Sequence, residues 1–221
     1  MRREPGVREI LRRLQRVHGP LTSPRRLDPL DELVLTILSQ NTSDTNRDRA
    51  WIALRERFPT WEDVTDAPTR AVEDAIRPGG LARTKAPRIQ AVLRAVCEAR
   101  GRCDLRFLRR ASDEEAKAFL GSLPGVGPKT VACVLAFSLG RPALPVDTHV
   151  HRVARRLGLI GPRVGAGPAH GALEALVRPP DRLPIHVALI RHGRTVCRAQ
   201  RPRCEECVLS DLCPRVGVAP G

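Results

Sequence analysis

The sequence predicts a helical protein, and three kinds of observation support this. Ser112 followed three residues later by Glu115 is a capping box, the pattern of a helix start. Asp28 followed by Pro29 combines an N-cap residue with a proline at the first helical position. Apolar residues recur at the spacing of one helix face, as at Ile89, Val92, Leu93 and Val96. Every element that these signals predict is a helix.

Taken in order along the chain, the same signals predict a series of short helices. The first is basic and amphipathic, with an apolar stripe of Val7, Ile10, Leu11 and Leu14. A further helix is capped by Thr60, and residues 100–110 form a basic connector. The remaining helices are expected at about 28–38, 45–54, 71–76, 85–99, 112–123, 128–140, 148–157, 169–177 and 185–191.

Composition narrows the class of partner. The chain has 221 residues, of which 42% are apolar, so it can bury a sizeable core. Its net charge of +14 implies an anionic partner, either nucleic acid or, as a rival, a membrane surface. No run of about 18 apolar residues is present, and the N-terminus lacks the apolar core of a signal peptide, so we expect a cytoplasmic protein without a membrane span.

The segment Gly125-Val126-Gly127 is the most informative stretch of the sequence for function. It follows the helix that ends near Pro124, and Pro128 begins the next helix. Two glycines around one apolar residue allow successive backbone N–H groups to converge on one point. Two helices joined in this way, with free amides at the start of the second, predict a site for a phosphate oxygen.

Lys129 and Asp147 are the candidate catalytic residues. The helix dipole disfavours an ammonium at Lys129, in the first turn of its helix, and a deprotonated lysine is a nucleophile. Only three lysines occur in the chain, and arginine could not form a Schiff base in their place. Asp147 is the expected N-cap of the helix that begins at Thr148. If its carboxylate lay near Lys129, it would raise the pKa of the amine and so oppose the helix dipole.

These motifs resemble the helix-hairpin-helix family of DNA glycosylases, and most closely the endonuclease III family. The resemblance runs from about residue 11 to 213. It implies an all-α, two-lobed fold with a DNA cleft between the lobes. One lobe is a six-helix barrel over residues 28–138, with the hairpin at 112–140. The other joins residues 1–27 to 139–221 and is an iron-sulfur cluster domain.

The same resemblance assigns roles to single residues. It implies that Lys129 attacks the sugar and that Asp147 stabilises the charge that develops there. It places an amide side chain in the gap left by an extruded base, where this sequence has Asn41, with Gln40 one position earlier. Leu81 is the expected apolar wedge between bases. The remaining expected DNA contacts are Gly125, Val126, Gly127, His149 and Arg194.

Four of the seven cysteines lie close together near the end of the chain, at Cys197, Cys204, Cys207 and Cys213. By ligand type alone, four thiolates could hold either zinc or an iron-sulfur cluster. Their spacing equals that of the 4Fe-4S loop of the resembled family, which favours the cluster. The other three cysteines are expected to be reduced, with Cys133 a thiol in the core.

The resemblance implies a bifunctional DNA glycosylase and AP lyase of base excision repair. It would act as a monomer on double-stranded DNA containing oxidised pyrimidines or abasic sites, in association with the bacterial nucleoid. Two alternatives stay open. One is a glycosylase with shifted specificity, of the mismatch or adenine type, although adenine glycosylases generally lack a lysine at position 129. The other is a damage-binding module without chemistry, which would need neither Lys129 nor Asp147.

Overall fold

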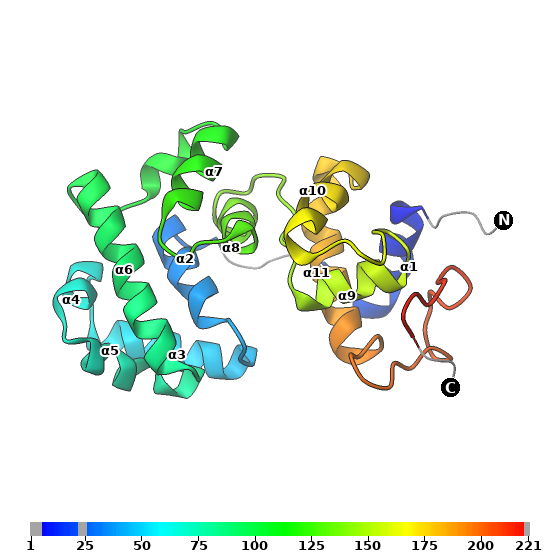
Figure 1. Ribbon diagram of the computed structural model, residues 1–221, viewed down its shortest axis with the longest axis horizontal. Helices are drawn as coiled ribbons and strands as arrows, with labels where there is room; N and C mark the ends of the chain where they lie inside the picture. Colours follow the sequence, from blue (N-terminus) through cyan, green and yellow to red (C-terminus); the bar gives the residue numbers. More distant parts are fainter. Residues whose placement is uncertain (1–5, 22–25, 219–221) are drawn as a thin grey trace. The chain divides into compact units, whose positions relative to one another are not determined.

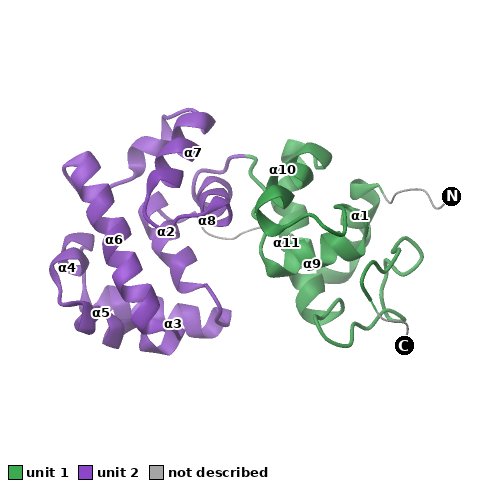
Figure 2. Cartoon of the chain, viewed as in Figure 1, with its two compact units in different colours: residues 1–24, 142–221 green, residues 25–141 purple. Residues whose placement is uncertain are grey.

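The structure is a computed structural model that describes residues 6–21 and 26–218. All regular elements in these ranges are helical (Figure 1). The chain divides into two compact units, residues 25–141 and residues 1–24 with 142–221 (Figure 2). From the sequence, divisions were expected after residues 27 and 138, whereas those of the structure fall after residues 24 and 141. No helix in the described ranges is long and apolar enough to cross a membrane.

The unit of residues 25–141 is built around α2 (Pro29–Leu38). Most residues of this helix are buried, as expected for a helix that is apolar on nearly all sides. It packs against α3, α6, α8, η2 and η3. The elements of this unit after α2 are α3 (Asp44–Arg57), α4 (Trp61–Asp66), α5 (Thr69–Ile76), η1 (Arg77–Gly79), α6 (Ala82–Arg100), η2 (Arg106–Arg109), α7 (Asp113–Ser122), α8 (Pro128–Cys133) and η3 (Val134–Ser138).

The other unit packs around α11 (Arg182–Thr195), which contacts both α1 (Val7–His18) and α9 (Thr148–Arg156). Its remaining elements are α10 (Ala166–Leu176) and η4 (Pro179–Asp181). The apolar stripe of α1 closes this core, since Ile10 and Leu14 are fully buried. A segment from the start of the chain is therefore packed among helices from its end.

Side-chain caps start several helices where the sequence predicts them. Thr60 and Ser112 both form complete capping boxes, with Asp63 and Glu115 respectively. Asp147 accepts a hydrogen bond from the amide of Val150 and so caps α9.

The predicted helix over 128–140 differs in one respect. It is α-helical only to Cys133 and then continues as a π-helix to Ser138, before Gly140 takes a φ of 66°. The connector at 100–110 contains the short 3₁₀ helix η2.

Candidate active site and cysteine-lined pocket

In the turn between α7 and α8, one of the two glycines has a backbone conformation that favours glycine. Gly125 has a φ of 69°, in the left-handed region that residues with a Cβ resist. Val126 is buried, and its amide donates to the carbonyl of Leu123 at 3.1 Å. Gly127 is the N-cap of α8 and has an extended backbone that any residue could adopt. A Cβ on Gly127 would meet no described atom within 4 Å.

Arg88 of α6 connects this hairpin to the turn after α2. A Cβ on Gly125 would lie 2.9 Å from Nε of Arg88, so the guanidinium lies directly against the hairpin. The same guanidinium donates to Oε1 of Gln40 at 3.1 Å. Gln40 is thus half-buried and bound by Arg88, whereas Asn41 is exposed with a φ of 50°.

Lys85 holds two loops together at one end of the same unit. Its ammonium is buried and donates to the carbonyl of Leu38 at 2.8 Å and to that of Gly79 at 2.9 Å. The first carbonyl ends α2, just before Gln40 and Asn41. The second lies two residues before Leu81, whose side chain is 54% exposed and whose φ is 52°. The structure therefore brings two predicted DNA contacts, Asn41 and Leu81, to neighbouring loops.

The three lysines have different surroundings. Lys85 is buried and hydrogen-bonded, and Lys117 on α7 is exposed. Lys129, in the first turn of α8, is half-buried and makes no hydrogen bond or ion pair with any described residue. Of the three, Lys129 alone combines partial shielding from water with a side chain not engaged by the protein.

Glu32 on α2 is a buried carboxyl that the sequence analysis missed. Only 8% of its surface is exposed, and it accepts a hydrogen bond from the hydroxyl of Thr36 at 3.2 Å. Burial raises the pKa of Glu32 to about 7, although the Thr36 hydrogen bond and the charge of Lys129 oppose this. A sequence signal exists: Glu32 and Thr36 are spaced one helical turn apart in a helix whose only other polar residue is Asp31.

Asp147, His149 and Arg194 come together in the other unit. His149 lies half-buried between the N-terminus of α9 and α11, where its ring contacts Gly193. Burial lowers the pKa of His149; the carboxylate of Asp147 opposes this, and the charges of Arg152 and Arg194 add to it. Lys129 belongs to the unit of residues 25–141 and Asp147 to the other, so each unit carries one of the two predicted catalytic side chains.

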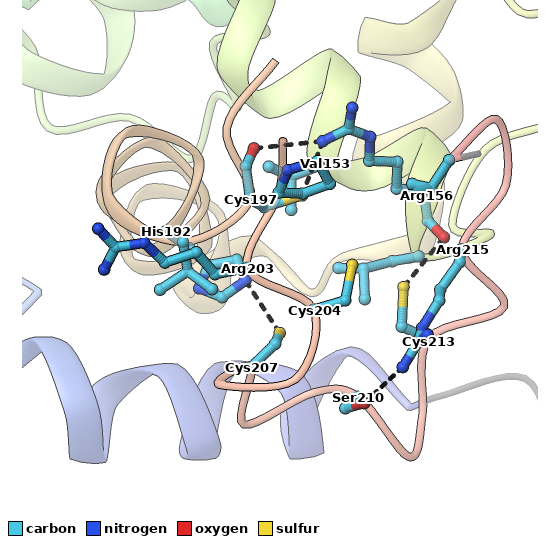
Figure 3. A pocket seen from close by; sticks show the side chains of 14 residues that line it. Val153, Arg156, His192, Cys197, Arg203, Cys204, Cys207, Ser210, Cys213 and Arg215 are labelled. Carbon is cyan, nitrogen blue, oxygen red and sulfur yellow. Dashed lines mark hydrogen bonds between the residues drawn. The ribbon is translucent and has the colours of Figure 1, made fainter. Parts of the chain in front are cut away.

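All four C-terminal cysteines line one pocket (Figure 3). Arg156 of α9 donates to Sγ of Cys197 at 3.4 Å and to the carbonyl of Arg198 at 2.6 Å. The thiol of Cys213 donates to the carbonyl of Arg156 at 3.2 Å. His192 of α11 is buried, with Nε2 3.4 Å from Sγ of Cys207. Sequence reasoning missed Arg156 and His192, because nothing in their local pattern links them to a loop beyond residue 196.

The pocket sulfurs do not form the closely spaced set that a single zinc ion needs. Thiolates around one zinc at 2.3 Å lie about 3.8 Å apart. Within the described ranges, three potential metal-binding atoms lie within 4.8 Å of one another only at Glu62, Cys97 and Cys103, so no three of the four pocket sulfurs approach so closely. Burial raises the pKa of the Cys207 and Cys213 thiols, so a bound metal is needed to favour their thiolates.

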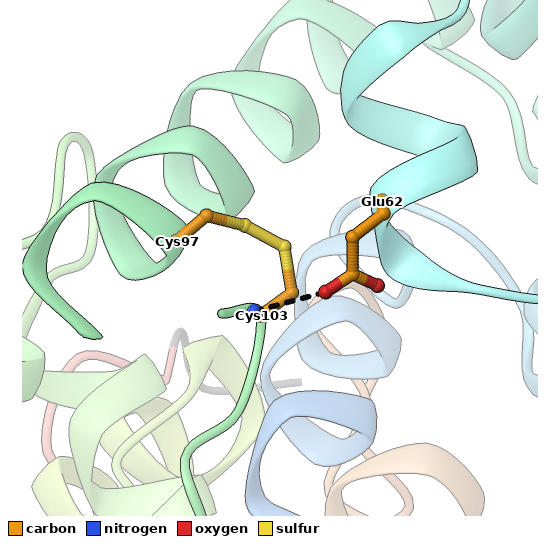
Figure 4. Close-up of side chains that lie close together, drawn as sticks. All are labelled: Glu62, Cys97 and Cys103. Carbon is orange, nitrogen blue, oxygen red and sulfur yellow. Dashed lines mark hydrogen bonds between the residues drawn. A yellow bond between two sulfur atoms is a disulfide. The ribbon is translucent and has the colours of Figure 1, made fainter. Parts of the chain in front are cut away.

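One expectation about cysteines is wrong. Cys97 and Cys103 were expected to be reduced, but the structure joins them in a disulfide (Figure 4). Cys97 is in the last turn of α6, and the left-handed Gly101 reverses the chain so that Cys103 returns to it. The carboxylate of Glu62 accepts a hydrogen bond from the amide of Cys103. Cys133 is buried, as predicted.

Comparison with known proteins decides the family. Residues 34–179 match the HhH-GPD superfamily of base excision DNA repair proteins, and residues 197–213 match the iron-sulfur binding domain of endonuclease III. The chain is 36% identical to endonuclease III of Thermotoga maritima over 212 residues, covering 95% of this chain and 91% of that protein. The chain belongs to the endonuclease III family.

A further relative and two solved structures agree with this. A candidate DNA glycosylase from Arabidopsis thaliana is 39% identical over 191 residues, which are 85% of this chain and 65% of that protein. A non-covalent endonuclease III–DNA complex matches with a TM-score of 0.81 at 30% identity, and a trapped covalent intermediate with 0.80 at 28%. Both matches cover 95% of this chain and 94% of the solved one.

The family assignment confirms three predictions from sequence. The fold is the all-helical fold of helix-hairpin-helix glycosylases, and the protein is a DNA glycosylase of base excision repair. Its cofactor is a 4Fe-4S cluster, and the matched iron-sulfur domain spans the four cysteines that line the pocket. Four soft ligands around one pocket suit such a cluster, which links separate points of a loop that has little regular structure of its own.

Proposed function

We propose that this glycosylase is bifunctional. It removes oxidised pyrimidines from double-stranded DNA and then cuts the strand at the abasic site as an AP lyase. The observation that carries this proposal is the state of Lys129, a half-buried amine at the start of α8 with no hydrogen-bonding partner in the described ranges. A relative trapped as a covalent endonuclease III–DNA intermediate supports covalent chemistry in this chain.

The proposed reaction begins with an extruded base, whose removal from the duplex is easier when damage has weakened its stacking and pairing. The neutral amine of Lys129 attacks C1′ of the deoxyribose as the bond to the base breaks. The amine loses a proton, the departing base takes one up, and opening of the sugar ring gives a Schiff base between Nζ and C1′. Loss of a C2′ proton then forms a double bond and expels the 3′ phosphate.

Asp147 supplies negative charge to this reaction. Its carboxylate caps α9 by accepting a hydrogen bond from the amide of Val150, and the group can stabilise positive charge that develops at the sugar as the base leaves.

The hairpin and the loops held by Lys85 would grip the DNA. Gly127 has no left-handed φ, and a Cβ at this position would meet no neighbour within 4 Å, so nothing inside the described protein requires a glycine there. Close approach of a DNA phosphate to the backbone provides a reason. The exposed Leu81 is suited to enter the base stack, and Asn41 rather than Gln40 is suited to fill the gap, because Arg88 already engages Gln40.

Borohydride trapping on duplex DNA with one abasic site tests the lyase. We expect a covalent adduct with the wild-type protein and none with Lys129→Ala. Lys117→Ala is the matched control, since it removes an exposed lysine from the same unit. Tight binding of the wild-type protein without any adduct would contradict the proposal and support the binding module instead.

A panel of duplexes, each with one defined lesion, tests the substrate class. We expect excision of oxidised pyrimidines by a protein that sediments as a monomer. Excision confined to mismatched thymine or to adenine would overturn the oxidised-pyrimidine assignment.

A further inference from the structure

Arg88 of α6 contacts two loops that are expected to bind DNA. Its Nη1 donates to Oε1 of Gln40 at 3.1 Å, in the turn between α2 and α3. A Cβ on Gly125 would lie 2.9 Å from Nε of Arg88 and 3.3 Å from both Cζ and Nη2, so the guanidinium fills the space beside the hairpin turn. Helix α6, the turn and the hairpin all belong to residues 25–141 (Figure 2). One guanidinium therefore joins the hairpin to the turn that carries Asn41.

Lys85, one turn earlier on α6, holds the same turn through its backbone. Its ammonium donates to the carbonyl of Leu38 at 2.8 Å. Lys85 and Arg88 are three residues apart and so lie on one face of the helix. Asn41 directly follows Gln40 and is exposed, in the left-handed region with a φ of 50°. The turn is therefore anchored immediately before the side chain that is proposed to fill the gap in DNA.

A half-buried guanidinium at this place needs a reason. Nε of Arg88 is buried without a hydrogen-bond partner in the described ranges, and leaving such a donor unpaired costs stability. An apolar side chain would avoid this cost. The planar guanidinium, however, can contact two groups at once in a fixed geometry, which the single ammonium of a lysine cannot do. Arginine is thus suited to hold two loops at a set spacing.

We propose that Arg88 is a positioning residue that couples the hairpin to the insertion of Asn41 into damaged DNA. The hairpin fixes the position of a phosphate, and the hydrogen bond from Arg88 to Gln40 then fixes where Asn41 enters the duplex relative to that phosphate. The charge of Arg88 also attracts DNA, but that attraction does not depend on Gln40. This inference rests on the proposed roles of the hairpin and of Asn41.

Equilibrium binding to two duplexes tests the proposal. One duplex is undamaged, and the other carries a tetrahydrofuran abasic-site analogue, which offers no aldehyde to an amine. The preference is the ratio of the two dissociation constants. Gln40→Met keeps the volume of the side chain and the charge of Arg88 but removes the acceptor. We expect its binding to undamaged DNA to stay within about twofold of wild type and its preference for the analogue to fall about tenfold.

Two further variants separate geometry from charge. Arg88→Lys keeps the positive charge without the planar fork, so its preference should fall about as far as that of Gln40→Met. Arg94→Met is the matched control, since it removes another arginine of α6, one that donates to the carbonyl of Thr65. Its preference should equal that of wild type.

The decisive comparison repeats these measurements in an Asn41→Ala background. If Gln40 acts by positioning Asn41, then Gln40→Met should cause little further loss of preference once Asn41 is alanine. A loss of the same size in both backgrounds would mean that the hydrogen bond only supports the fold, and this overturns the proposal. An Asn41→Ala protein with the wild-type preference also overturns it.

If Gln40→Met does not fold, Arg88→Lys in the two backgrounds gives the same comparison. An unchanged preference in Arg88→Lys, or in Gln40→Met, overturns the proposal. Equal binding of the two duplexes by the wild-type protein would instead contradict the proposed recognition of abasic sites. A missing borohydride adduct would contradict the proposed lyase, but it would not alter the outcome of these binding measurements.

Discussion

At the scale of single residues, the described chain keeps several side chains and conformations that stability alone does not favour. Glu32 is a carboxyl inside an apolar helix, and Leu81 exposes an apolar side chain on a left-handed backbone. Each is costly by itself, the first through lost hydration and the second through steric strain and exposure. At such residues, a substitution is expected to lower activity without lowering stability.

Glu32 makes stability depend on pH with a definite sign. Its pKa is raised from 4.5 to about 7 on folding, so the folded state holds the proton more tightly than the unfolded state. Its contribution is fully present below pH 4.5 and is lost as the pH rises through about 7, a difference of about 3 kcal/mol. Urea unfolding of wild type and Glu32→Gln at acidic and alkaline pH measures it. The variant should gain stability relative to wild type at alkaline pH, and a constant difference between them would contradict the account.

Leu81→Gly should separate stability from activity. Glycine adopts a φ of 52° without strain, so the free energy of unfolding should stay the same or rise by about 1 kcal/mol. Excision should fall, since the proposed wedge is gone. Val17→Ala, at an equally exposed position on α1, is the control and should leave excision unchanged. A Leu81→Gly protein as active as wild type would show that Leu81 is not a wedge.

At the scale of elements, the structure shows what sequence patterns can and cannot predict. Local rules predicted the caps at Thr60, Ser112 and Asp147, because capping depends on residues within one turn. The disulfide between Cys97 and Cys103 was missed because it depends on a chain reversal at Gly101, within a connector without a periodic pattern. The burial of Glu32 was missed for a similar reason, since it depends on which helices surround α2.

Alanine substitutions at Gly125 and, as a control, at Gly121 test whether the hairpin turn requires its glycine. Gly125→Ala places a Cβ on a φ of 69° and 2.9 Å from Nε of Arg88, so we expect about 1–2 kcal/mol of destabilisation and weaker DNA binding. Gly121→Ala, inside α7 with nothing within 4 Å of its Cβ, should instead stabilise by about 0.5–1 kcal/mol. Thermal unfolding of both variants checks the difference. Equal effects would mean that the turn does not require its glycine.

At the scale of the whole molecule, the chain distributes its chemistry between two units. One carries Lys129, Glu32 and the loops of Asn41 and Leu81, and the other carries Asp147 and the four pocket cysteines. The sequence could predict these residues from motifs, except Glu32, but not how far each side chain is exposed or what it bonds. That Arg88 engages Gln40 while Asn41 is exposed is visible only in the folded chain.

The cluster should be needed for the unit of residues 1–24 and 142–221 to stay folded. Cys204→Ser removes one of four ligands, so we expect loss of iron, sulfide and the visible absorption band, with a clear drop in thermal stability. Cys133→Ser, at a buried cysteine outside the pocket, should keep the iron. Full iron content in Cys204→Ser would show that this cysteine is not a ligand.

The central claim is that the amine of Lys129 forms the covalent bond to DNA. The most direct measurement is peptide mass spectrometry of the borohydride-reduced adduct between wild-type protein and abasic-site DNA. The account predicts that the sugar remnant is found on Nζ of Lys129. A remnant on Lys117, on Lys85 or on the N-terminal amine would contradict it.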